Sequence, residues 1–136
     1  TIREIRHYTD RPIRIRPHPI KRDYGEEVEA ISQQKGVEWV DPKAQRPLDE
    51  DMSNAWATVC YTSGVGVDSI LSGVPVVGCH PGCFAYPISS PIEDIEAPKL
   101  PDRQQWCNDI AYVQWSLDEI EQGLPWEHLK PVLYSK

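Results

Sequence analysis

Apolar residues follow two different periods along the chain, and the two periods alternate. Spacings of three to four residues predict helices, which we place at residues 1–9, 26–36, 47–57, 66–73 and 102–123. Short alternating or continuous apolar runs predict strands, which we place at residues 12–19, 37–41, 58–62 and 74–79. This order predicts an α/β fold: a three-layer sandwich around one mostly parallel sheet of about four strands, with the C-terminal helices packed on it.

Three segments depart from this alternation. Residues 80–101 contain five prolines, so we expect an irregular connection there. Ser116 and Glu119 match a capping box, which predicts a break in the last helix. We expect residues 124–136 to form a tail.

The length of 136 residues suits one domain, so we expect residues 1–136 to form a single domain. The chain starts with TIREIRHYTDRP and not with Met, and we expect it to be a fragment of a larger protein. Its net charge of −7 argues against general nucleic-acid binding, which needs a basic face. Residues 1–22 nevertheless hold seven basic and two acidic residues, which is compatible with a small anionic ligand or with a solvated helix face.

The four cysteines show no CxxC spacing, and we expect them to be reduced in a cytoplasmic setting. A zinc site at Cys79, His80 and Cys83 is an alternative, but its spacing is not a recognised one, and we expect no metal. No apolar run approaches the roughly 20 residues of a membrane helix, so we expect no membrane span.

Two polar motifs fall at the expected carboxyl ends of strands, where ligands bind to open parallel sheets. Residues 16–19, RPHP, follow the first strand, and residues 62–66, TSGVG, follow the third. Prolines stiffen the first loop, and glycines in the second let backbone N–H groups approach an anion closely. We therefore expect both motifs on one rim of the sheet.

The second motif is typical of a turn that holds a phosphate. A helix that begins after Ser63 in the sequence offers unpaired N–H groups and the positive end of its dipole. Thr62 and Ser63 add hydroxyl donors, and Arg16 and His18 add charge-assisted hydrogen bonds. The alternative is that Ser63 only caps the helix and the glycines only form the turn.

Two further residues fall on the same rim. Asp68 lies in the first turn after the loop, where its carboxylate either favours the helix dipole or accepts hydrogen bonds from ribose or sugar hydroxyls. His80 follows the fourth strand and is either a ligand contact or an ordinary loop histidine.

Residues 13–19, IRIRPHP, followed by residues 57–79, ATVCYTSGVGVDSILSGVPVVGC, resemble the C-terminal half of GT-B glycosyltransferases. The closest pattern is that of capsule-polysaccharide transferases of the Kdo type and of phage glycosyltransferase-like proteins. The resemblance covers residues 11–129. It implies a Rossmann-like domain that binds a nucleotide-sugar donor, with the donor as substrate and no cofactor. It also implies a missing N-terminal domain that carries the acceptor site and any catalytic base, so no catalytic residue is assigned and the isolated chain is expected to be inactive.

The resemblance also implies roles for individual residues. Arg16 and His18 meet the diphosphate of the donor, and Thr62, Ser63 and Gly64 hold the same phosphates. Two residues are assigned to the ribose or the sugar, Asp68, where these families usually have Glu, and His80.

Two other classes of function stay open. One is a non-catalytic module that binds a nucleotide or a glycan, or serves in assembly, and the third candidate is a nucleotide-sugar epimerase. The acceptor in the transferase hypothesis is a glycan or a similar molecule, and an exposed sheet edge is compatible with a homodimer.

Overall fold

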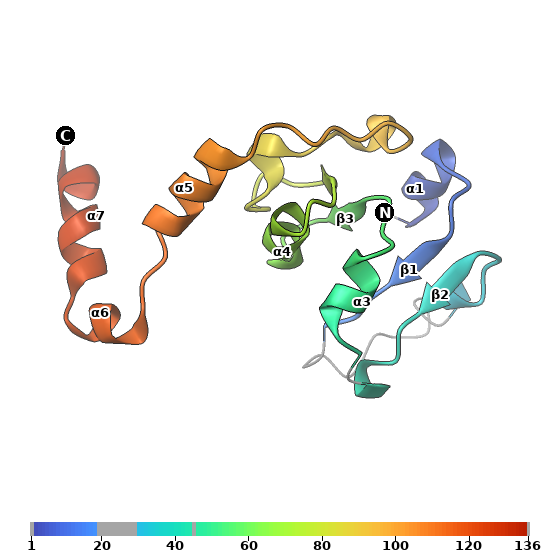
Figure 1. The fold of residues 1–136 in the computed structure, drawn as a ribbon, viewed down its shortest axis with the longest axis horizontal. Coiled ribbons are helices and arrows are strands. Elements are labelled where there is room, and N and C mark those ends of the chain that lie inside the picture. Colours follow the sequence, from blue (N-terminus) through green and yellow to red (C-terminus); the bar gives the residue numbers. More distant parts are fainter. Residues whose placement is uncertain (1, 19–29, 45, 136) are drawn as a thin grey trace. The chain divides into compact units, whose positions relative to one another are not determined.

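The computed structural model describes residues 2–18, 30–44 and 46–135, and it divides the chain into two compact units, Thr1–Pro101 and Asp102–Lys136 (Figure 1). The first unit contains seven regular helices and strands among its described residues, in this order: α1 (Ile2–Tyr8), β1 (Ile13–Ile15), β2 (Val37–Trp39), α3 (Leu48–Met52), β3 (Thr58–Cys60), α4 (Val65–Leu71) and β4 (Val76–Gly78). The α/β class and the positions of these elements are confirmed, although each is shorter than the sequence pattern predicts. No described helix combines the length and the apolar character needed to cross a membrane.

The described strands form two separate parallel pairs, so the prediction of one sheet of about four strands is wrong. β1 pairs with β2, with Ile13 opposite Val37, and β3 pairs with β4, with Cys60 opposite Gly78. Every strand is only three residues long, which limits the hydrogen bonds that it can offer to a further neighbour. The segment around Ser90 adds a single parallel bridge to Val77 of β4.

Side chains connect the two strand pairs where backbone hydrogen bonds do not. Ile5 of α1, Val77 of β4 and Ile95 form a buried apolar cluster. Ile13 of β1 and Val59 of β3 both pack against this cluster. The two strand pairs are therefore joined through a shared apolar core and not through a continuous sheet.

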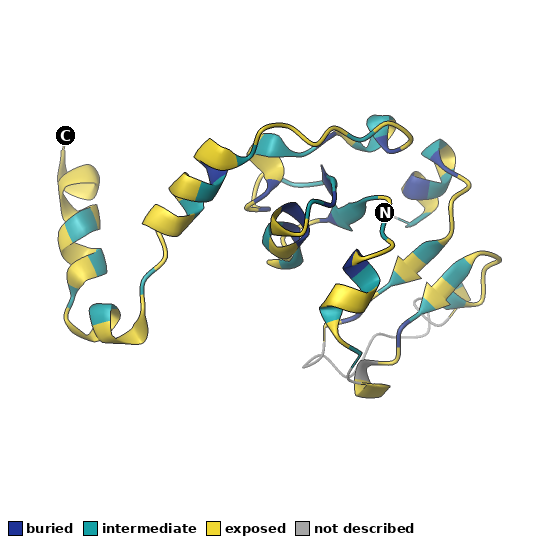
Figure 2. Cartoon of the chain, viewed as in Figure 1, coloured by how far each residue is buried: buried dark blue, intermediate teal, exposed yellow. Residues whose placement is uncertain are grey.

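The packing around α4 and β4 is the densest part of the first unit. Ile70, Val76 and Val77 are completely buried, and Figure 2 shows dark blue segments in this region. Ser69 is also completely buried, and its hydroxyl oxygen lies within hydrogen-bond distance of the hydroxyl oxygen of Thr58 (2.7 Å) and of the carbonyl oxygen of Val74 (3.3 Å). A buried hydroxyl needs such partners, so these bonds fix α4 against β3 and the start of β4.

Residues 80–101 form the irregular connection that the prolines predict. Two short 3-10 turns, Tyr86–Ile88 and Ile92–Asp94, interrupt it, and a third lies earlier in the chain at Pro42–Ala44. Although irregular, the connection supplies buried residues to the core, namely Cys83, Ala85, Ser90 and Ile95.

The predicted helix at residues 26–36 lies partly outside the described residues. Residues 30–32 are helical, and Gly36 has a φ of 76°, as expected for a glycine that closes a helix. Pro19, the last residue of the predicted first strand, also lies outside the described residues.

The second unit contains α5 (Gln104–Tyr112), α6 (Leu117–Glu121) and α7 (Leu124–Tyr134). The predicted break is confirmed, because Ser116 and Glu119 form a complete capping box at the start of α6. The prediction of a tail at residues 124–136 is wrong. Pro125 lies in the first turn of α7, where no N–H donor is needed, and α7 also accommodates Pro131.

Candidate functional site

The carboxyl ends of β3 and β4 bring two polar loops to one edge. The strands are parallel, so residues 61–64 and residues 79–82 leave the pair on the same side. The Cys79 N–H donates to the carbonyl oxygen of Cys60 (2.8 Å), which holds the two loops together where they begin. We define the β3–β4 site as residues 61–64 and 80–82.

The two loops of the β3–β4 site touch through Gly82. The Gly82 N–H donates to Nδ1 of His80 (2.9 Å), and a Cβ added at Gly82 would lie 3.0 Å from that nitrogen and 3.3 Å from Cγ2 of Thr62. A side chain at position 82 would therefore push the loops apart. Because Nδ1 accepts a hydrogen bond, the neutral ring carries its proton on Nε2, which leaves an N–H donor on the other side of the ring. The structure thus brings together two of the predicted residues, Thr62 and His80.

Ser63 forms hydrogen bonds at the start of α4, where Gly64 and not Ser63 is the N-cap residue. Its hydroxyl oxygen accepts a hydrogen bond from the Val65 N–H (3.3 Å), and its carbonyl oxygen accepts one from the Gly66 N–H (3.2 Å). Gly64, the N-cap residue of α4, has ordinary helical angles of φ −60° and ψ −20°. A Cβ added at Gly64 would meet no atom within 4 Å, so the fold does not require glycine there and the space beside it is open.

Asp68 is exposed in the first turn of α4. A carboxylate at this place stabilises the helix through its dipole, and its exposure also leaves it accessible to a ligand hydroxyl. The predicted contact with a ribose stays a prediction.

Arg16 belongs to a cluster of charged side chains around Asp51, which contains none of the residues of the β3–β4 site. Its guanidinium donates to the Asp51 carboxylate (2.5 Å) and to the carbonyl oxygen of Arg46 (2.6 Å). Arg14 and Arg46 also form ion pairs with Asp51, at 3.1 Å and 3.2 Å. The Asp51 side chain is only 11% exposed, so three arginines surround one largely buried carboxylate. Arg16 can therefore reach a phosphate only if it leaves Asp51.

Sequence reasoning missed this arginine cluster, although its signal was present. Arg14 lies in β1 and Arg16 directly follows it, and α3 begins with a run of acidic residues. The two elements are far apart in sequence, so only the fold shows that they meet. His18 is exposed, two residues beyond Arg16, and its role at a diphosphate stays a prediction.

The cysteines near the β3–β4 site are structural in character. All four cysteines of the chain are free thiols, and Cys60 and Cys83 are buried. Burial raises the pKa of the Cys60 thiol to about 12, with smaller contributions from Cys83 and Cys79. Cys60 is therefore protonated at neutral pH and is not a nucleophile. Within residues 2–18, 30–44 and 46–135, no group of three or more His, Cys, Asp or Glu side chains is arranged to hold a metal ion.

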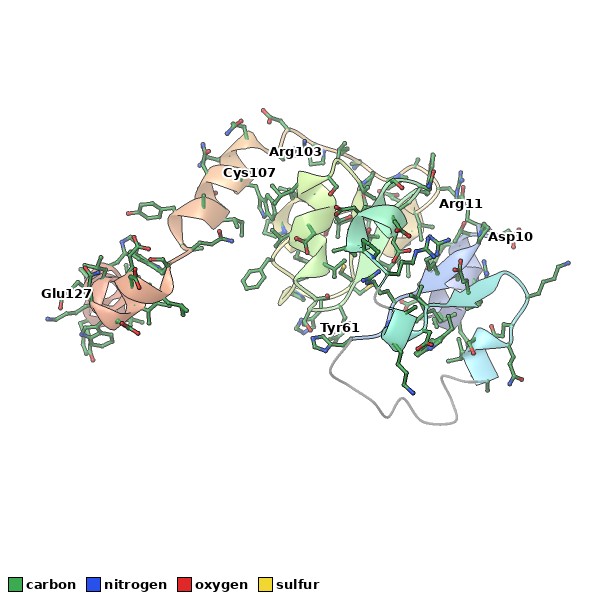
Figure 3. The ribbon with its side chains drawn as sticks, turned by 60° about the horizontal axis from the view of Figure 1, so that its bottom comes forward. Asp10, Arg11, Tyr61, Arg103, Cys107 and Glu127 are labelled. Carbon is green, nitrogen blue, oxygen red and sulfur yellow. The ribbon has the colours of Figure 1, made fainter. Side chains whose placement is uncertain are left out.

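A separate cavity of about 580 Å³ is lined by residues 6–11 and Glu96. Figure 3 labels Asp10 and Arg11 at this cavity and Tyr61 at the β3–β4 site. Two of its charged groups form an ion pair, because Arg11 Nε lies 3.1 Å from the Glu96 carboxylate, and Arg6 donates to the carbonyl oxygens of Arg11 and Gly36.

The geometry defines a class of site: two short polar loops at the carboxyl edge of a parallel strand pair, one of them leading into a helix. No protein-family model, curated protein or solved structure matches the chain.

Proposed function

We propose that the chain is the donor-binding domain of a glycosyltransferase of the GT-B type, with Rossmann-like layering, and that it binds a nucleotide sugar. The parent enzyme transfers the sugar to a glycan or a similar acceptor. In this proposal the acceptor site and the catalytic base belong to a partner domain, so the chain alone binds the donor without turnover. The four free cysteines support a reducing, cytoplasmic setting.

One observation carries the proposal: the loops after β3 and β4 meet at one edge, beside open space at Gly64. The hydrogen bond from the Cys79 N–H to the Cys60 carbonyl oxygen joins the two loops where they begin, and the Gly82 N–H holds the His80 ring, so both loops are ordered without a ligand. Preformed donors of this kind bind an anion without reorganisation.

The chemistry of the β3–β4 site suits a diphosphate. Thr62 and Ser63 supply hydroxyl groups, Gly64 supplies its backbone N–H group, and His80 supplies its Nε2–H donor. Together they stabilise the negative charge that develops on the departing nucleotide as the bond to the sugar breaks. In this proposal Arg16 leaves Asp51 and, with His18, adds hydrogen-bond donors from the loop after β1, and Asp68 accepts hydrogen bonds from ribose or sugar hydroxyls.

Isothermal titration of CMP, UDP, CDP and GDP tests the proposal. We expect binding of at least one nucleotide, and we expect His18→Ala to weaken it about 10-fold or more, because a hydrogen bond to a charged group contributes about 1.5–3 kcal/mol. The matched control is His7→Ala, which removes another exposed histidine, on α1, and should leave the affinity unchanged. Absence of binding to all four nucleotides contradicts the proposal, and equal affinities of wild type and His18→Ala remove His18 from the site.

A non-catalytic nucleotide- or glycan-binding module is the second candidate. The ion pair between Arg16 and Asp51 favours it, because a guanidinium that stays on Asp51 is not free to stabilise a leaving group. Release of free sugar from a nucleotide sugar by the full-length parent distinguishes the two, since only the transferase supports it.

A further inference from the structure

An aromatic pair borders the β3–β4 site. The ring of Tyr61, the first residue after β3, stacks on the ring of His80, with 4.7 Å between the centroids and an angle of 26° between the planes. The hydrogen bond from Gly82 to Nδ1 fixes the His80 ring, so the partner of Tyr61 is held in place by the loop itself. The sequence pattern indicates a role for His80 but none for Tyr61.

More than half of the Tyr61 surface is open although the residue has a stacking partner. It is 58% exposed although His80 covers one face of its ring, so the exposed surface lies mainly on the other face and the ring edge. Figure 3 shows Tyr61 at the periphery of the ribbon. A fixed aromatic ring with an open face is a surface on which a second planar ring can stack.

We propose that Tyr61, supported by His80, is the stacking surface for the base of a bound nucleotide. This inference rests on the proposed function, because it places the base directly beside the loop that holds the diphosphate. Tyr61 and Gly64 are three positions apart in one exposed loop, so the base of one nucleotide can contact Tyr61 while its phosphates contact Gly64. Stacking is tolerant of the identity of the base, because every base has a flat π-face. The pair therefore supplies affinity for the nucleotide and not selection among bases.

The test separates the base from the phosphates. We compare UDP, CDP, GDP and inorganic diphosphate by isothermal titration against wild type, Tyr61→Phe and Tyr61→Ala. The expected result is that Tyr61→Ala weakens each nucleoside diphosphate about 10- to 100-fold, while Tyr61→Phe retains the affinity. Inorganic diphosphate, which has no base, should bind all three proteins equally.

The matched control is Tyr112→Ala. Tyr112 is 68% exposed and also contacts a histidine, His128, at 4.8 Å, but edge-on at 72°, and it lies in the second unit. We expect Tyr112→Ala to leave all affinities unchanged. Circular dichroism checks that each variant is folded.

The outcomes distinguish the two proposals. If wild type binds neither a nucleoside diphosphate nor inorganic diphosphate, the proposed function fails and this inference fails with it. If nucleoside diphosphates bind and Tyr61→Ala binds them as well as wild type does, the stacking inference alone is overturned. An equal loss of inorganic diphosphate in Tyr61→Ala also overturns it, because the side chain would then act on the loop and not on the base.

Discussion

Replacing Gly64 with aspartate is expected to abolish nucleotide binding while the chain stays folded. The fold has room for the new side chain, because a Cβ at this position meets no atom within 4 Å and the backbone angles are ordinary. A carboxylate at the start of α4 also suits the helix dipole. In the β3–β4 site, however, it places a negative charge beside the bound phosphates. Two unit charges 4 Å apart repel by about 4 kcal/mol near a protein surface, so we expect an affinity loss of about 100-fold or more at low salt.

The control for this prediction is Gly64→Ala, which adds a Cβ without charge. Its free energy of unfolding, measured by urea denaturation, should match or slightly exceed that of wild type, and its affinity should fall less than that of Gly64→Asp. If Gly64→Asp binds nucleotides as tightly as wild type, the phosphates do not lie at this turn. Salt gives a second check, because the difference between the two variants should shrink as ionic strength rises.

Replacing Gly66 with valine is expected to destabilise the first unit by about 3 kcal/mol. Gly66 is buried, and a Cβ there would lie 3.2 Å from the sulfur of Cys83, 3.3 Å from Cβ of Ala85 and 3.7 Å from the sulfur of Cys60. Cys83 and Ala85 are almost completely buried, so they have no free space into which to move. The two further methyl groups of valine then force α4 away from the core. Urea denaturation followed by circular dichroism measures the change.

Gly64→Val is the matched control for Gly66→Val. It makes the same substitution two positions earlier, where the surrounding space is open, and we expect a change of less than about 1 kcal/mol. Equal destabilisation by the two variants would show that helix propensity, and not packing against Cys83 and Ala85, determines the effect.

The sequence predicts the order of helices and strands well, because that order depends on local hydrophobic periods. The capping box at Ser116 is equally local, and its predicted break in the last helix is confirmed. Two other predictions, the sheet of about four strands and the C-terminal tail, are wrong for physical reasons. The number of strands in a sheet depends on which backbones meet, and three-residue strands hold only one neighbour each here. The prediction of a tail at residues 124–136 fails because a proline in the first turn, Pro125, is compatible with a helix.

The candidate site shows the same division between local and long-range information. Thr62 and His80 lie at the same edge because each comes two positions after the end of a parallel strand, which the sequence pattern already indicates. The partner of Arg16 could not be predicted, because Asp51 is 35 positions away and belongs to a helix that no strand-based rule places beside β1. The stack of Tyr61 on His80 likewise depends on the exact conformation of the loop after β4.

The central claim is that the turn after β3 and the loop after β4 hold the phosphates of a nucleotide. Titration of ¹⁵N-labelled protein with UDP and CMP, followed by amide chemical shifts, tests this claim directly. The account predicts that the largest shift changes fall on the amides of residues 62–66 and 80, with those of residues 6–11 little affected. Shift changes centred on residues 6–11, or spread over the second unit, would contradict it.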